Sequence, residues 1–190
     1  MDAITLLKAD HKTVSGLFRK FDQLGERAHK SKRKLVDQII EELSVHAAVE
    51  EQLLYPFVQE HVPDANDLRL ESLEEHFVVK RALADLEDLD PEHERFDAKV
   101  TVLKEMVKHH VDEEEQELFP QLRDAAGRNE LRDLGAAIAA AKKAAPTRPH
   151  PLLPDEPPLN VVAGAAAATF DKARDVGKDA VDKVRERVGA

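Results

Sequence analysis

Two stretches of the sequence place a histidine and a glutamate four residues apart. One reads HAAVEEQLLYP from His46 and the other HVDEEEQELFP from His110, so both begin HxxxEEQ and end on an aromatic residue followed by proline. Residues i and i+4 lie on one face of a helix, about one turn apart. His46 with Glu50, and His110 with Glu114, can therefore each direct an imidazole and a carboxylate at one metal ion.

These stretches belong to a longer internal repeat. They lie 64 residues apart, from 46 to 110, and the pairs Asp10-His11 and Glu75-His76 are offset by 65 residues, from 11 to 76. Each half of the chain thus contributes a lone histidine followed by a His-x-x-x-Glu motif. An imidazole or a carboxylate is costly to bury among leucines unless it is paired or bound to metal. Six such residues related by a repeat indicate a buried metal centre.

Four amphipathic helices with apolar stripes would position these residues. We expect them at residues 2–24, at 32–61 with a kink at Pro56, from 63 to a break at Asp90-Pro91, and from there to about residue 123. At about 1.5 Å per residue, the four repeat histidines lie at a similar height in their helices. The sequence therefore predicts an all-α fold, an antiparallel up-down-up-down four-helix bundle.

The chain is expected to continue beyond the bundle in three parts. We expect a bundle domain over residues 1–125, a short fifth helix on its outside within 126–145, a proline-rich extended linker over 146–160, and an alanine-rich, charged amphipathic tail over 161–190. The tail is interpreted first as a solvated segment that packs transiently on the bundle. Self-association, a protein partner and weak contact with a membrane surface are its alternatives.

The charge and composition exclude several classes of protein. The 190 residues include 38 acidic and 28 basic side chains, and the resulting charge of −10 repels nucleic acid phosphates and anionic lipid. No cysteine is present, which excludes disulfides, zinc fingers and iron–sulfur clusters. The N-terminus lacks the pattern of a signal peptide, and no apolar run reaches spanning length. We expect a cytoplasmic protein with no nucleic acid partner and no integral membrane segment.

The six residues of the repeat resemble the metal ligands of the hemerythrin-like (HHE cation-binding) domain, over about residues 1–125. They are His11, His46, Glu50, His76, His110 and Glu114. The resemblance implies two non-haem iron ions in the bundle core, bridged by the two glutamates, with the two histidines of each half on one iron. It implies reaction with a small oxygen species, either dioxygen binding or catalase-like decomposition of hydrogen peroxide. An iron or oxygen sensor or a nitric-oxide scavenger, which would not be an enzyme, is the alternative.

Two further residues bear on this chemistry. Hemerythrins that carry dioxygen have a second histidine one turn after the third-helix histidine, and here that residue is Lys80. The resemblance then implies more open coordination sites, which favours peroxide chemistry over oxygen transport. Lys80 either donates a hydrogen bond to a bound oxygen species or extends to solvent. Tyr55, the only tyrosine, is interpreted as a core aromatic residue, with contact to the metals as the alternative.

The types of the ligands leave the identity of the metal open. Zinc or manganese accepts the same nitrogen and oxygen ligands as iron. A bundle with buried His–Glu hydrogen bonds and no metal would also have this pattern of residues. Glu51 and Glu115 are expected to be exposed acids or additional groups around the metals, and His109 is expected to face away from the centre.

Overall fold

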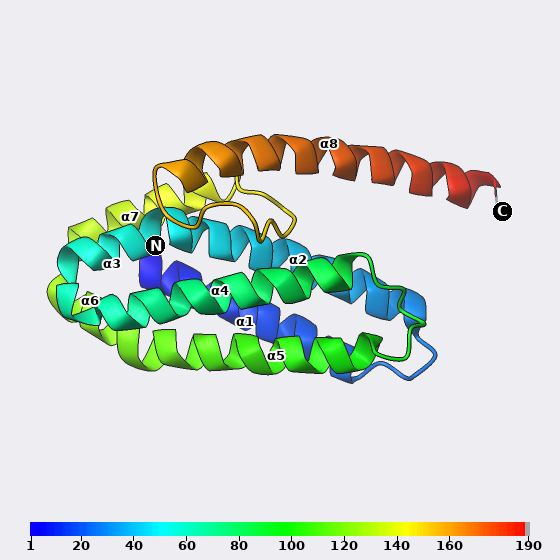
Figure 1. The fold of residues 1–190 in the computed structure, drawn as a ribbon, viewed down its shortest axis with the longest axis horizontal. Coiled ribbons are helices and arrows are strands. Elements are labelled where there is room, and N and C mark those ends of the chain that lie inside the picture. The colour runs from blue at the N-terminus through cyan, green and yellow to red at the C-terminus, as the bar shows by residue number, and fades with distance from the viewer. Residues whose placement is uncertain (189–190) are drawn as a thin grey trace.

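The computed structural model describes the backbone of residues 1–188 and the side chains of residues 1–174. Within that range the chain forms helices and no strands, and four antiparallel rods make up the body of the molecule (Figure 1). The rods are α1 (Ala3–Asp22); α2 (His29–Val49) with η1 (Glu50–Leu54) and α3 (Tyr55–His61); α4 (Asn66–Glu87) after the short turn η2 (Pro63–Ala65); and α5 (Phe96–Glu113) with η3 (Glu114–Leu118) and α6 (Phe119–Ala125). The predicted all-α four-helix bundle is confirmed.

The second and fourth rods each contain a wide helical turn just before a proline. Residues 50–54 and 114–118 are π-helical, and the N–H groups of Tyr55 and Phe119 donate to the carbonyls five residues earlier. Proline has no N–H, and its ring clashes with the carbonyl four residues before it in an α-helix. The wide turn relieves this clash at Pro56 and Pro120. The rod therefore continues through Pro56 by adding a residue to one turn.

The bundle core consists of two apolar clusters with the repeat histidines between them. On α1, Leu7 belongs to one cluster, Val14 belongs to the other, and His11 lies between them. On each of the other three rods the histidine also lies between residues of the two clusters. Burial of these apolar side chains drives packing of the rods at about 25 cal/mol per Å² removed from water. The two clusters also hold the histidine layer away from solvent.

Helix α7 (Arg128–Ala141) packs on the outside of α1. It ends at Ala141, four residues before the end of the range in which the fifth helix was expected. At Gly135 the helix comes very close to the start of the chain, because an added Cβ would lie 2.6 Å from the Met1 carbonyl oxygen and 2.7 Å from the Ala3 nitrogen. Only a residue without a Cβ allows the two backbones to come this close.

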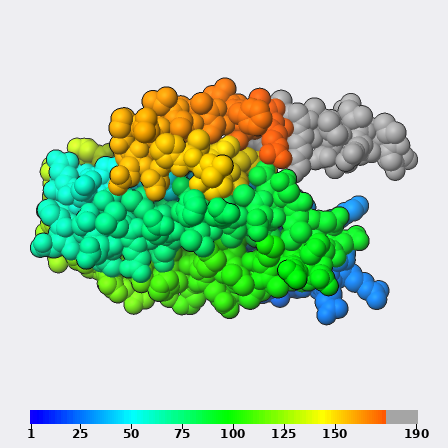
Figure 2. All heavy atoms as spheres, in the orientation of Figure 1, coloured from blue at the N-terminus to red at the C-terminus, as the bar shows by residue number. Residues whose placement is uncertain are grey.

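The chain then turns back over the bundle before the last helix. Residues 146–158 follow an irregular, turn-rich path over α2 and α4, and α8 (Leu159–Val188) begins two residues before the expected tail (Figures 1 and 2). The apolar tail positions from 176 onward lie outside the residues whose side chains are described. None of the helices in the described part of the chain combines the length and apolarity needed to cross a bilayer.

Candidate metal centre

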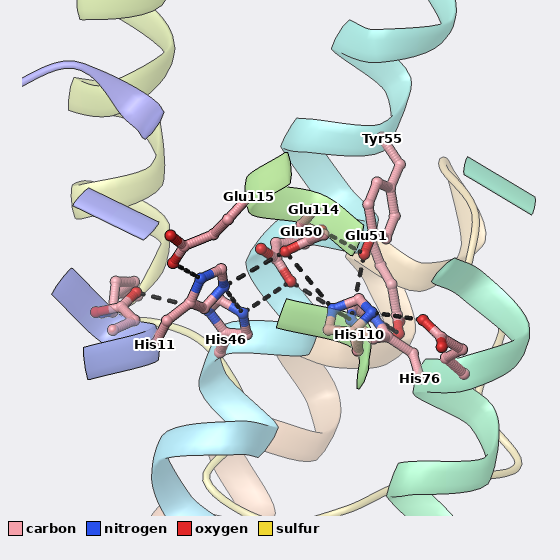
Figure 3. Close-up of polar contacts among 12 residues, drawn as sticks. His11, His46, Glu50, Glu51, Tyr55, His76, His110, Glu114 and Glu115 are labelled. Carbon is pink, nitrogen blue, oxygen red and sulfur yellow. Dashed lines mark hydrogen bonds and ion pairs between the residues drawn. The ribbon is translucent and has the colours of Figure 1, made fainter. Parts of the chain in front are cut away.

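The six repeat residues meet in one layer of the bundle core (Figure 3). Every one of them is at most 5% exposed. The Nε2 atoms of His11 and His46 lie 3.2 Å apart, and those of His76 and His110 lie 3.1 Å apart. The histidines thus form two pairs, each from one half of the repeat, with their ring nitrogens facing each other.

The two glutamates lie between these histidine pairs. Glu50 Oε2 is 3.1 Å from His46 Nε2 and 3.4 Å from His76 Nε2. The same atom of Glu114 is 3.4 Å and 3.6 Å from Nε2 of His11 and His110. Each carboxylate therefore faces one histidine from each half of the chain, which is the arrangement that a bridging ligand requires.

The ligand atoms form two groups that share one carboxylate. Within each group they lie within 4.8 Å of one another. One group is His11, His46, Glu50 and Glu114, and the other is Glu50, His76 and His110. Two neighbouring cations sharing Glu50 would fit this distribution of nitrogen and oxygen atoms.

A carboxylate lies behind each imidazole, on the Nδ1 side. The pairs are His11 with Glu115 at 2.9 Å, His46 with Asp10 at 3.7 Å, His76 with Glu51 at 3.1 Å, and His110 with Glu75 at 2.8 Å. Three of the pairs are at hydrogen-bond distance, whereas the His46–Asp10 pair is longer. An Nδ1–H that donates to a carboxylate leaves the Nε2 lone pair free to face a metal.

These outer carboxylates follow the repeat. Asp10 and Glu75 each precede the lone histidine of their half, and each faces the histidine of the His-x-x-x-Glu motif in the same half. Glu51 and Glu115 each follow the central glutamate, and each faces the lone histidine of the other half. No role is predicted from the sequence for Asp10 or Glu75. The acidic residue that directly precedes each lone histidine is the feature of the sequence that could have indicated one. Exposure was the first expectation for Glu51, yet it is 5% exposed.

Tyr55 and Lys80 lie at different depths in the centre. The Tyr55 hydroxyl is 3.1 Å from Glu114 Oε1, to which it donates, and 3.2 Å from His76 Nε2. Tyr55 is 1% exposed, so it is both a core residue and a polar contact of the central layer. Lys80 is 8% exposed and does not extend to solvent, because its Nζ lies 2.9 Å from Glu51 Oε1. Lys80 thus contacts the carboxylate behind His76.

The surroundings shift the pKa values of the central groups in opposite directions. Burial raises the pKa of the Glu50 carboxyl, and the negative charge of Glu114 raises it further. Burial acts in the same sense on Glu114, but positive charge on His110 and His11 outweighs it and lowers the pKa of that carboxyl. Burial lowers the pKa of His46 to about 4. Two carboxyl groups this close to each other favour different protonation states.

The buried oxygens of the central glutamates supply a test of whether a cation fits. Both carboxylate oxygens of Glu50, and Oε2 of Glu114, have no hydrogen-bond partner within the described chain. A buried carboxylate without donors carries an uncompensated desolvation cost of several kcal/mol. A divalent cation between these oxygens and the Nε2 atoms would compensate that cost, so the donor set fits a metal.

Two openings lie next to the histidine layer. An apolar cavity of about 20 Å³ is bordered by the four histidines and by aliphatic side chains such as Val14, Val79 and Val107. A groove of about 660 Å³ between α1 and α5 reaches His11 and Glu115 and is bordered by five basic side chains. The five are Lys8, Lys12, Arg19, Lys104 and Lys108. The cavity has room for a molecule of two or three atoms, and the groove opens toward solvent.

His109 faces away from the central layer, as expected from the sequence. Its side chain is 64% exposed, and its Nε2 lies 3.6 Å from Glu75 Oε1 and 3.4 Å from Glu113 Oε1. The other oxygen of Glu75 is the partner of His110. His109 therefore belongs to the surface above the centre.

The chain is similar to known proteins. Residues 2–122 match the family model of the hemerythrin HHE cation-binding domain. An uncharacterised hemerythrin-like protein of Schizosaccharomyces pombe is 30% identical over 141 residues, which cover 74% of this chain and 70% of that protein. A DNA nickase of Nostoc sp. is 27% identical over 142 residues, which cover 75% of this chain but 39% of the nickase.

A solved structure agrees with the sequence matches. The crystal structure of a hemerythrin HHE cation-binding-domain-containing protein from Mycobacterium kansasii aligns with a TM-score of 0.65 at 26% identity, over 75% of this chain and 86% of that one. The family match covers well over half of the chain, and the resemblance stated from the sequence is confirmed. The chain belongs to the hemerythrin HHE cation-binding domain family, whose members bind metal cations through a helical bundle.

Proposed function

We propose that the centre holds two iron ions bridged by Glu50 and Glu114, and that the protein decomposes hydrogen peroxide in a catalase-like reaction. The observation that carries the proposal is the Glu50 carboxylate, which is fully buried, has no hydrogen-bond donor among the residues whose side chains are described and faces one histidine from each half. Carboxylate and imidazole ligands suit iron, and no thiolate is present in the chain.

The protein residues would prepare the site for this chemistry in three ways. Bound iron would supply a redox pair that accepts and returns electrons. The outer carboxylates hold three of the imidazoles with Nε2 directed inward, including His11 and His110. The apolar clusters on either side exclude bulk water from the layer. The Tyr55 hydroxyl presents an O–H donor to the ligand layer.

Two features favour peroxide as the substrate. Disproportionation converts two molecules of hydrogen peroxide into two of water and one of dioxygen, so protons must move between oxygens in the site. The buried Tyr55 hydroxyl, 3.1 Å from Glu114 Oε1, is the group that we expect to transfer these protons. Lys80 pairs with Glu51 and supplies no nitrogen ligand, which leaves room for an exogenous oxygen species.

Binding of dioxygen or nitric oxide by an iron or oxygen sensor or a scavenger is the second candidate. The observation that favours it is the apolar cavity of about 20 Å³ beside the four histidines, because such a cavity suits a diatomic molecule better than a strongly hydrated one. The likeness to a DNA nickase supports no proposal of DNA cleavage, since the match covers 39% of that protein and the charge of −10 repels DNA.

The test combines metal content with peroxide turnover. Elemental analysis of the purified chain should give two irons per molecule, and the visible absorption should change on addition of hydrogen peroxide while dioxygen is released. Bound iron with a reversible dioxygen or nitric-oxide spectrum and no peroxide turnover would favour the second candidate. A chain that holds no iron after exposure to ferrous iron under anaerobic conditions would refute both.

A further inference from the structure

Residues 146–174, called the cap below, lie outside the family match and cover part of one face of the bundle (Figure 2). Buried polar contacts fix them to one another. Asp171 on α8 is 1% exposed. Its carboxylate accepts hydrogen bonds from the backbone N–H groups of Thr147 and Arg148, both at 3.1 Å, and lies 3.0 Å from His150 Nε2. A buried carboxylate with three partners fixes the proline-rich path to the helix that follows it.

The cap is also fixed to both ends of α4. Near the start of α4, the guanidinium of Arg69 lies 2.8 Å from Glu156. At the end of α4, Glu87 lies 3.1 Å from Arg148 and 3.0 Å from Arg174. The cap therefore has a defined position over the face formed by α2 and α4.

Within the cap, Asn160 reaches the wide turn that carries the central glutamate. Asn160 is 4% exposed, and its Nδ2 donates to the backbone carbonyl of Glu51 at 3.1 Å and to that of Asp155 at 3.0 Å. One turn later, an added Cβ at Gly164 would lie 3.0 Å from the Gln52 side chain. The start of α8 thus packs closely against η1.

The Glu51 carbonyl needs a donor from outside its own rod. In η1, the N–H of Tyr55 donates to the carbonyl of Glu50. The donor for Glu51 in the same wide register would be residue 56, which is Pro56 and has no N–H. A buried carbonyl without a donor is destabilising. Asn160 supplies the hydrogen bond that proline removes.

We propose that Asn160 is a positioning residue of the metal centre, acting through the Glu51 carbonyl. It holds the wide turn in the register that directs Glu50 between the histidine pairs and Glu51 toward His76. This inference deepens the proposed function, because it assumes that Glu50 and His76 hold a metal. In the corresponding turn of the second half, Glu115 borders the open groove between α1 and α5, and none of the cap residues borders that groove.

The test measures metal release from the full-length chain. The chain and its variants are loaded with Co²⁺, whose visible bands report ligand geometry, and release to an excess of chelator is followed. Asn160→Ala removes the hydrogen-bond donor. Asn160→Asp also removes the donor but keeps the shape of the side chain, and an acidic residue is favourable in the first turn of a helix such as α8. Both variants should release metal about tenfold faster and should have shifted Co²⁺ absorption bands. Tenfold is the lower end of the effect expected when a group that orients metal ligands is removed. The control Asn129→Ala, at an exposed residue of α7, should match the parent chain.

A second substitution tests the carbonyl itself. Pro56→Ala restores an N–H that can donate to the Glu51 carbonyl, so adding Asn160→Ala to that variant should change the release rate by less than about threefold. The same tenfold acceleration in both backgrounds would overturn the assignment, since Asn160 would then act elsewhere.

The outcomes separate this inference from the proposed function. A parent chain that binds no Co²⁺ and no iron contradicts the metal centre itself. A parent chain that binds metal, while both Asn160 variants keep its release rate and its bands, contradicts only the role of Asn160. Far-ultraviolet circular dichroism checks that each variant remains helical.

Discussion

For three of the four imidazoles, a carboxylate at hydrogen-bond distance from Nδ1 determines which ring nitrogen faces the centre. Glu75 lies 2.8 Å from His110 Nδ1, the shortest of the four pairs, and is itself partly exposed. A donor at Nδ1 fixes the tautomer with its lone pair on Nε2, and the negative charge makes that nitrogen a better ligand.

Replacing Glu75 by glutamine should therefore weaken metal binding without removing a ligand. The amide keeps the shape of the carboxylate but loses its charge, and we expect an affinity lower by about 10-fold to 100-fold, measured by competition with a chelator. Glu74→Gln, next to it on the exposed side of α4, is the control and should leave the affinity unchanged. Equal affinities for the two variants would show that the charge behind His110 is unimportant.

His46 should make the metal-free protein sensitive to acid. Its pKa is lowered to about 4 in the folded chain, mainly by burial, from 6.5 in the unfolded chain. Because the unfolded chain binds the proton more readily, stability is lost as the pH falls from 6.5 toward 4, by about 2 kcal/mol between pH 7 and pH 5. Urea unfolding of chelator-treated protein at the two pH values measures this loss.

His46→Gln separates this effect from that of its neighbours. The pKa of His110 is raised, so His110 contributes stability below pH 6.5 and acts in the opposite sense. The loss between pH 7 and pH 5 should be smaller in the variant by about 2 kcal/mol. An identical pH dependence in the two proteins would mean that His46 is not a buried neutral imidazole.

Among the helices, the contact between α7 and the start of α1 depends on a single glycine. An added Cβ at Gly135 meets backbone atoms at 2.6 Å and 2.7 Å, and backbone cannot move aside as a flexible side chain can. Gly135→Ala should thus lower the free energy of unfolding by about 1–3 kcal/mol. Gly16→Ala is the matched control, because the nearest atom there is 4.0 Å away, at the end of Arg19. That change should raise stability by about 0.5–1 kcal/mol in the same denaturation assay.

The helices and the meeting of the six central residues in the core could be predicted because their signals are local. Spacing of four residues places His46 and Glu50 on one face wherever a helix forms, and the repeat extends this to the second half. The wide turns were not predicted, since proline at 56 indicates a disturbed helix without specifying how the backbone adapts. The contact of Asn160 with Glu51 spans 109 residues and depends on packing that no local pattern records.

At the scale of the whole molecule, metal and fold should be coupled. The unfolded chain cannot bring four histidines and two glutamates together, so a cation that binds the folded chain stabilises it. With free metal at about 1,000 times its dissociation constant, each bound ion should raise the free energy of unfolding by about 4 kcal/mol over the chelator-treated protein.

His46→Ala provides the control for this coupling. Without that imidazole, adding metal should shift the unfolding midpoint much less than in the parent chain. A parent chain whose unfolding is the same with and without metal would contradict a buried metal centre.

The crossed pairing of the two halves has one more consequence. His11 is held by Glu115, and His76 by Glu51, so neither half contains all the groups that orient its own histidines. A single half, a hairpin of two helices, could complete its site only by associating with a copy of itself, with each copy lending the acid that the other lacks. The present chain therefore has the arrangement of a symmetric pair of hairpins that has been joined into one polypeptide. In this arrangement the sequence of each hairpin is free to change independently. One such difference is Tyr55 in the first half, whose equivalent in the second half is Phe119.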